Sequence, residues 1–181
     1  MKFEQFVVCV AFVGIIILGG NILNKIYVRI AITPHIKKRN QYGTFLYDQK
    51  LKMFKAEINW CYQNAVTAYW CCADHSSESG LRIQRYFDDL MVYSPMWDRK
   101  VRSYIVNEIF TKPASFHADI RKSISKTKLY EKLIMNRVAV YPVGMVEFGI
   151  KMCLNNDQYY VLVLAYLDGS LQTMDMKKIK E

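Results

Sequence analysis

Apolar residues recur along the middle of the chain at steps of three and four, as they do on one face of an amphipathic helix. The pattern runs without a break over about six helical turns, and lysine, glutamate, glutamine and asparagine occupy the positions beside it. It predicts one long helix from about Leu51 to Cys72. The apolar positions are Leu51, Phe54, Ile58, Cys61, Ala65, Ala68 or Tyr69, and Cys72.

Three shorter helices are expected after this segment. The first spans about 81–91, and the second opens at Ser94-Pro95, where serine suits the cap and proline the first turn. Lys112-Pro113 ends that second helix because proline cannot continue it. The third is expected at 115–125, where Phe116, Ile120 and Ile124 are spaced by four.

Beyond residue 132 the apolar period changes from helical to alternating, which predicts strands. The expected strands are 133–141, 146–154, a nearly all-apolar segment at 159–167, and 171–176. Asp168-Gly169 between the last two is a strong hairpin pattern. Helices followed by a meander of about four antiparallel strands predict a single α+β domain.

The N-terminus contains a long apolar segment. Every residue from Phe6 to Leu18 is apolar or glycine, and the uncharged stretch is about 20 residues long, enough to cross a bilayer. We therefore expect a transmembrane anchor at 1–24, a linker at 25–44 and a folded domain at 45–181. A cleaved signal peptide is the alternative, although Gly19-Gly20-Asn21 is a poor cleavage site. The anchor residues are Phe6, Val10, Phe12, Gly14, Ile17, Gly19, Gly20 and Leu23, and its glycines would allow another helix to approach closely.

The chain is basic, with a net charge of +9. Most lysines and arginines are spread along the sequence, which is typical of a solvated surface. Two local clusters, Lys37-Lys38-Arg39 and Lys177-Lys178 with Lys180, lack the aromatic platform or motif of a nucleic-acid site. The excess of positive charge after the anchor favours a cytoplasmic C-terminal domain.

The sequence contains no familiar catalytic or cofactor-binding motif. The nearest metal-ligand set is Cys61, Cys71, Cys72 and His75, but helical spacing separates Cys71 from the other two cysteines. These cysteines can be small core residues, metal ligands or reactive thiols. The neighbours Asp88-Asp89 cannot form a close acid–base pair on a helix. We expect no enzyme, no metal site and no cofactor.

Tyr93, Met96 and Trp97 cluster where the second and third helices meet. Aromatic residues and methionine are enriched at protein interfaces, so this cluster is a candidate partner-binding patch. A corner of the core is the other interpretation.

The order of elements and several segments resemble the TraE family of conjugative type IV secretion proteins, relatives of the eighth VirB component. The segments are the N-terminal anchor, Ala31-Ile32-Thr33-Pro34, Leu90-Met91-Val92-Tyr93-Ser94-Pro95, Val138-Ala139-Val140-Tyr141-Pro142, Gly149, Tyr159-Tyr160-Val161-Leu162-Val163-Leu164 and Asp168-Gly169.

The resemblance implies a cystatin-like cone domain with helices packed on a curved four-stranded antiparallel sheet. It also implies an inner-membrane scaffold with one membrane pass and a periplasmic domain. Such a scaffold would oligomerise and recruit other secretion-channel proteins for DNA transfer, without sequence-specific binding of nucleic acid.

Two other functions fit the sequence. A membrane-anchored binding module could hold an apolar ligand or peptide between sheet and helices, unless Phe148, Tyr159 and Trp97 pack that space shut. A pocket enzyme would need an inward-facing acid, and Glu147 is the one strand carboxylate that could serve.

Overall fold

The computed structural model describes residues 37–179 except 75, 113–114 and 155–156. In this part of the chain no helix is both long and apolar enough to cross a membrane. The expected anchor at 1–24 lies outside the described residues, and so do its residues Phe6, Val10, Phe12, Gly14, Ile17, Gly19, Gly20 and Leu23.

The described residues form one mixed sheet of eight strands, which lie in the sheet in the same order as in the sequence. Neighbouring strands are antiparallel except β4 and β5, which are parallel. The strands are β1 (Lys37–Asn40), β2 (Gly43–Asp48), β3 (Met53–Trp60), β4 (Gln63–Trp70), β5 (Leu133–Val140), β6 (Met145–Leu154), β7 (Asp157–Tyr166) and β8 (Leu171–Ile179).

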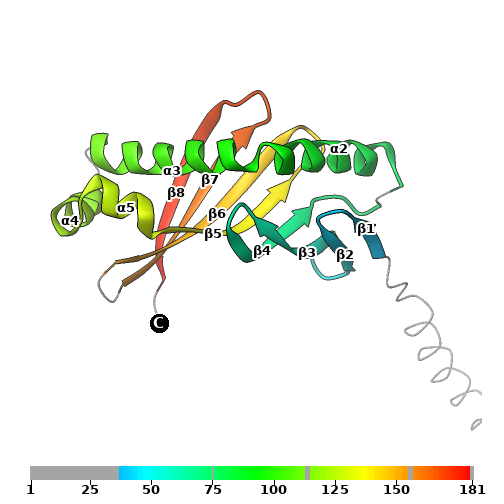
Figure 1. The fold of residues 1–181 in the computed structure, drawn as a ribbon, viewed down its shortest axis with the longest axis horizontal. Helices are drawn as coiled ribbons and strands as arrows, with labels where there is room; N and C mark the ends of the chain where they lie inside the picture. Colours follow the sequence, from blue (N-terminus) through cyan, green and yellow to red (C-terminus); the bar gives the residue numbers. More distant parts are fainter. Residues whose placement is uncertain (1–36, 75, 113–114, 155–156, 180–181) are drawn as a thin grey trace, which may run out of the picture. The chain divides into compact units, whose positions relative to one another are not determined.

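Four helices connect β4 to β5. A parallel pair of strands needs such a crossover, because the chain must return to the same end of the sheet. Figure 1 shows α2 and α3 in line along one face of the sheet, with α4 and α5 beside the far end of α3. The helices are α2 (Glu78–Val92), α3 (Ser94–Thr111), α4 (Ser115–Ser123) and α5 (Lys126–Lys132).

The expected long helix from Leu51 to Cys72 is wrong, because this segment is the β3–β4 hairpin. Side chains of β3 alternate between buried and exposed, and the buried set includes Ala56 and Trp60, which the helical pattern omits. Phe54 and Ile58 misled the prediction, since positions four apart also satisfy a period of two. β-Branched and aromatic residues then favour the strand.

The four-stranded antiparallel sheet of the expected cone domain is also wrong. Strands β5–β8 confirm the four segments predicted from alternation, but β1–β4 extend the sheet to eight strands and make it mixed. β1 and the start of β2 fall within 25–44, the range expected to be a linker. The described domain therefore begins at Lys37.

The helices predicted after the hairpin are present with small changes. α2, α3 and α4 match the expected ranges, while α5 was not foreseen. Ser94 is the first residue of α3 rather than its cap, and the cap position belongs to Tyr93.

Large aromatic side chains fill the space between the helices and the sheet. Trp60 and Trp97 both pack on Phe148, with ring centroids 5.9 and 5.7 Å away. On the β2–β4 side of the sheet, Phe45 stacks on Trp70 at 4.0 Å. All five side chains are buried, so the core continues beneath α2 and α3 across both halves of the sheet.

A largely buried ion pair lies at the edge of this core. Asp98 and Arg102 lie one turn apart on α3, with 2.6 Å between Oδ2 and Nε. Trp60 Nε1 donates to Asp98 Oδ1 at 3.1 Å. The Arg102 guanidinium also donates to the carbonyl oxygen of Leu133, the first residue of β5. The pair thus connects β3, α3 and β5.

Ala65 tests the hairpin directly. It is exposed, and its φ of 59° is left-handed, next to a register shift between β3 and β4. In this left-handed conformation an alanine is strained by about 1 kcal/mol relative to a glycine. We expect Ala65→Gly to raise the free energy of unfolding by about 0.5–1 kcal/mol in chemical denaturation followed by circular dichroism. In a helix, replacing alanine by glycine lowers the free energy of unfolding by about 1 kcal/mol. The control Ala118→Gly in α4 should show this loss. A loss at both positions would contradict the hairpin.

The Asp98–Arg102 pair should be essential for stability. Arg102→Met keeps much of the side-chain volume but leaves the Asp98 carboxylate, which is 18% exposed, without its cation. Removing one partner of a buried pair is strongly destabilising, and we expect a loss of about 3 kcal/mol in the free energy of unfolding. The matched control is Arg99→Met, an exposed position on the same helix, where a change within about 0.5 kcal/mol is expected. Equal losses in the free energy of unfolding for Arg102→Met and Arg99→Met would contradict a special role of the ion pair in stability.

Candidate functional site

The junction of α2 and α3 is formed by Tyr93 and Pro95. Proline at 95 has no N–H to donate to the preceding turn, so a continuous helix cannot pass this point. At the end of α2, the N–H of Tyr93 donates a hydrogen bond to the carbonyl oxygen of Asp89 at 3.1 Å. The carbonyl oxygen of Tyr93 accepts hydrogen bonds from the N–H groups of Met96 and Trp97, both at 3.0 Å. One residue thereby ends one helix and begins the next, and its side chain remains 57% exposed.

A groove of about 690 Å³ lies along this junction. Leu90 and Trp97 are buried at its floor, whereas Tyr93 and Met96 are more than half exposed at its rim. The three residues predicted as a partner-binding cluster therefore do line one depression. They differ in role, because Trp97 belongs to the core and the other two face solvent. The full lining is Tyr86, Asp89, Leu90, Tyr93, Met96, Trp97, Lys100, Leu167, Asp168 and Gly169.

The opposite wall of the groove is the β7–β8 turn. Gly169 has a φ of 94°, which glycine adopts without strain, and its carbonyl accepts a hydrogen bond from Lys100 Nζ. The same ammonium lies 5.7 Å from the centre of the Trp97 ring, in cation–π geometry. Lys100 thus holds the turn against α3. The sequence identified Asp168-Gly169 as a turn but could not place it beside Tyr93.

Asp168 supplies a fixed negative charge at this wall. Its carboxylate accepts hydrogen bonds from the backbone N–H and the hydroxyl of Ser170, at 2.7 and 2.8 Å. These bonds lower the pKa of Asp168 below its usual value. Asp89 lies on the α2 side of the same groove. The groove therefore has an apolar floor, with carboxylates at its edge.

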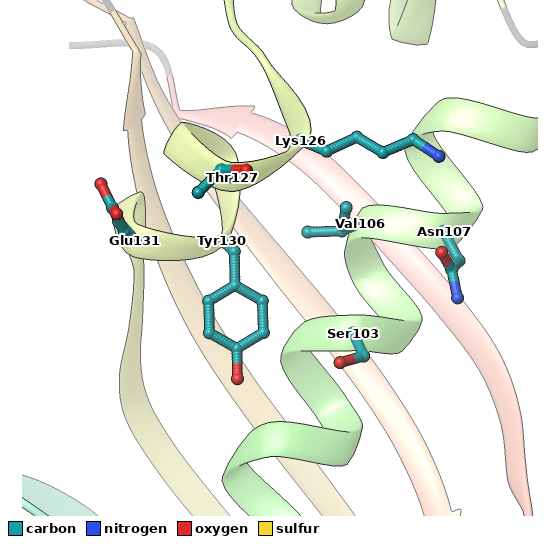
Figure 2. Close-up of a pocket in the computed structure, with 7 residues that line it drawn as sticks. All are labelled: Ser103, Val106, Asn107, Lys126, Thr127, Tyr130 and Glu131. Carbon is teal, nitrogen blue, oxygen red and sulfur yellow. The ribbon is translucent and has the colours of Figure 1, made fainter.

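A second pocket, of about 440 Å³, lies between α3 and α5 and was not foreseen from the sequence. Figure 2 shows Lys126 extended toward α3, with the Glu131 carboxylate on the side away from α3. The Lys126 ammonium lies 5.6 Å from the centre of the Phe110 ring. The lining is a polar mixture without a convergent acid and base, and we assign no chemistry to it. The remaining residues are Ser103, Val106, Asn107, Thr127 and Tyr130.

The space between the sheet and the helices is packed by side chains. Phe148, Trp97 and Tyr159 are buried there, at 0, 3 and 8% exposure. These are the residues that would have to leave room for an apolar ligand. Their packing argues against a binding module of that kind.

Glu147 faces away from the helices, since its neighbours Val146 and Phe148 are buried beneath them and strand side chains alternate. Its carboxylate pairs with Arg137 at 2.6 Å on the other face of the sheet. The guanidinium in turn lies 5.0 Å from the centre of the Tyr69 ring. The acid proposed for a pocket enzyme is therefore part of an ion pair on the opposite face of the sheet.

The three cysteines of the candidate metal set lie at different places in and directly after the β3–β4 hairpin. Cys61 lies in the β3–β4 turn, and Cys71 and Cys72 directly follow β4, while His75 lies outside the described residues. Within the described part of the chain, no cluster of three His, Cys, Asp or Glu side chains could hold a metal ion. Burial raises the pKa of all three thiols, that of Cys71 to about 11. Cys72 fits the core interpretation, whereas Cys61 and Cys71 are only partly buried.

Asp88 and Asp89 diverge as expected for helix neighbours. Burial, and the charge of Asp89, raise the pKa of Asp88. Asp89 is exposed and lines the groove.

Thiol reactivity should distinguish the cysteines. Cys153 is exposed on β6, whereas a pKa of about 11 leaves Cys71 almost wholly protonated at pH 7.5. The thiolate is the nucleophile, so alkylation of Cys71 should be at least tenfold slower than that of Cys153 and should accelerate about tenfold per pH unit below pH 11. Peptide mapping by mass spectrometry after timed iodoacetamide treatment measures each site. Cys153→Ser should remove the fast reaction, and equal rates at the two sites would contradict the structure.

Comparison of the chain with family models, with curated proteins and with solved structures gives no match. The resemblance to the TraE family therefore rests on the sequence segments that suggested it, and it remains a prediction. The groove at the α2–α3 junction is the site that the geometry itself supports.

Proposed function

We propose that this chain is a non-catalytic assembly protein and that the groove at the α2–α3 junction is its protein-binding site. The observation that carries the proposal is the exposure of Tyr93 and Met96 above the buried Trp97, in a groove walled by the β7–β8 turn. Exposed tyrosine and methionine beside a well-packed apolar floor are typical of the few residues that dominate binding energy. The helix break at Pro95 holds Tyr93 in this position.

We further propose that the protein works at the bacterial inner membrane as a scaffold of a conjugative type IV secretion system. This part rests on the apolar segment Phe6–Leu18 and on the sequence segments shared with the TraE family. The scaffold would self-associate and recruit other channel proteins through its C-terminal domain in the periplasm. The eight-stranded sheet is larger than the resemblance implied, so the proposal depends on the groove and the segments, not on a shared four-stranded fold.

The double variant Tyr93→Ala/Met96→Ala tests the groove. Truncating two exposed contact residues should weaken association about 30- to 700-fold, since each interface residue of this kind contributes about 1–2 kcal/mol and every 1.4 kcal/mol is about tenfold. Association of the full chain with itself is measured by analytical ultracentrifugation in detergent. A photo-crosslinking residue in place of Met96 identifies its neighbour in cells as a second copy or a channel subunit.

The matched control is Leu81→Ala/Val92→Ala, two exposed apolar residues of α2 that do not line the groove. It should leave association unchanged. Equal association of both double variants, with no crosslink from position 96, would overturn the proposed groove. A phosphatase that is active only outside the cytoplasm, fused at Glu181, reports the side of the membrane on which the C-terminus lies. An inactive fusion would place the C-terminus in the cytoplasm, which would overturn the secretion role and leave the groove proposal intact.

A further inference from the structure

Basic side chains gather at the end of the domain formed by α4, α5 and the ends of β6 and β8. The segment 112–132 contains six basic residues and only two acidic ones, Asp119 and Glu131. The register of the sheet brings β6 and β8 to the same end, where Leu133 pairs with Met152 and Gln158 pairs with Ile179. The basic residues at this end are Lys112, Arg121, Lys122, Lys126, Lys128, Lys132, Lys151, Lys177 and Lys178.

Several of these charges face solvent without a counter-charge. Lys122, Lys128 and Lys132 are exposed, and among the described residues none of them forms an ion pair with a carboxylate. Lys177 lies 3.4 Å from Asp175, and its side chain is 80% exposed. An exposed pair of this kind is weak. Lys112 and Lys178 also form ion pairs, with Glu108 and Asp157. The unpaired positive charge at this end therefore lies mainly on the exposed lysines of α4 and α5.

Exposed isoleucines lie among the lysines. Ile134 is 49% and Ile179 38% exposed. Across the sheet, Ile134 lies beside Lys151, Lys151 beside Tyr160, and Tyr160 beside Lys177. Because strand side chains alternate, Ile179 shares a face with Lys177. Apolar and basic groups of the strands are thus interleaved at this end, on the face of the sheet that points away from the helices.

This surface lies far from the groove. The β7–β8 turn forms the groove wall, and Ile179 lies at the opposite end of this strand pair, beside Gln158. A strand of 10 residues, such as β7, is about 30 Å long. A partner in the groove would leave the basic end free.

The chemistry of the basic end favours a lipid surface over a nucleic acid. Eight of its nine basic groups are lysines, compact point charges that lack the forked geometry of arginine for reading phosphates and bases. Exposed isoleucines suit the boundary between headgroups and acyl chains, whereas single-stranded nucleic acid requires exposed aromatic platforms. Each lysine near an anionic leaflet adds to binding.

We propose that this basic end binds the surface of an anionic phospholipid bilayer, with its lysines at the headgroup phosphates and Ile134 and Ile179 in the interface. The inference rests on the membrane attachment in the proposed function. It adds a second contact that fixes how the domain lies on the membrane.

The experiment uses the full chain in nanodiscs of phosphatidylcholine alone or with about 30% phosphatidylglycerol. An environment-sensitive fluorophore is placed on Cys153, which is exposed and shares its strand face with Lys151, in a Cys9→Ala background. Spin-labelled lipids quench the fluorophore if it approaches the bilayer. We expect quenching at least twofold stronger in the anionic discs, and its loss in 1 M salt, where the screening length falls to about 3 Å.

The triple variant Lys122→Gln/Lys128→Gln/Lys132→Gln should abolish this difference between the two discs. The matched control, Lys50→Gln/Lys52→Gln/Lys55→Gln, removes the same charge from exposed lysines in and beside the β2–β3 turn and should retain the difference. Circular dichroism checks that both variants keep the native fold.

Equal quenching in both discs, or equal effects of the two triple variants, would overturn the inference and leave membrane attachment standing. Binding of a single-stranded oligonucleotide that depends on the same lysines, without any lipid effect, would assign the surface to nucleic acid instead. Failure of the chain to enter either disc would overturn the membrane attachment and the inference with it.

Discussion

The side chains of Asp98 and Arg102 meet one turn apart on α3, and their ion pair reaches three separate parts of the chain. The Asp98 carboxylate accepts from the Trp60 indole at the end of β3. The Arg102 guanidinium donates to the carbonyl of Leu133, where α5 ends and β5 begins, and lies 3.4 Å from that of Tyr130. Partial burial strengthens each of these interactions, because little water competes for them. The pair therefore holds both halves of the sheet to one turn of one helix.

The position of the groove follows from this constraint. Once Asp98 is held over Trp60, the preceding residue Trp97 packs on Phe148 and becomes the groove floor. The helix break at Pro95 then leaves Tyr93 at the surface, and Lys100 fixes the β7–β8 turn on the other side. An interaction in the core thus determines the shape of a surface that lies outside it.

The sequence predicted the parts of the fold that depend on local pattern. Helices α2–α4 and strands β5–β8 follow from clear periodicity and from turn residues such as Asp168-Gly169. The prediction failed for the β3–β4 hairpin because Phe54 and Ile58 fit the period of a helix as well as that of a strand. In addition, the turn of this hairpin has a non-glycine residue, Cys61, at a φ of 52°. Such a turn lacks the usual glycine or asparagine marker.

Features that join distant parts of the chain could not be read from pattern at all. Asp98 and Arg102 look like an ordinary surface pair at a spacing of four, and only the fold shows that they are mostly shielded from solvent. The parallel pairing of β4 with β5 brings Tyr69 beside Ala139. For the groove, the sequence supplied Tyr93, Met96 and Trp97, but the wall at Leu167–Gly169 comes from a turn about 70 residues later. Local chemistry thus identified one side of the site, and topology supplied the other.

The helical crossover also explains why the two proposed surfaces lie apart. A parallel connection must return the chain to the end of the sheet where β5 starts. α2 and α3 make this return along one face, so their junction lies near the β7–β8 turn, while α4 and α5 lie at the far end with the start of β5. The connection from β4 to β5 does not require basic residues for its geometry. Its last 20 residues nevertheless contain more basic than acidic side chains. Topology separates an apolar groove from a basic end, and a protein partner and an anionic bilayer could then be held by one domain without competing for it.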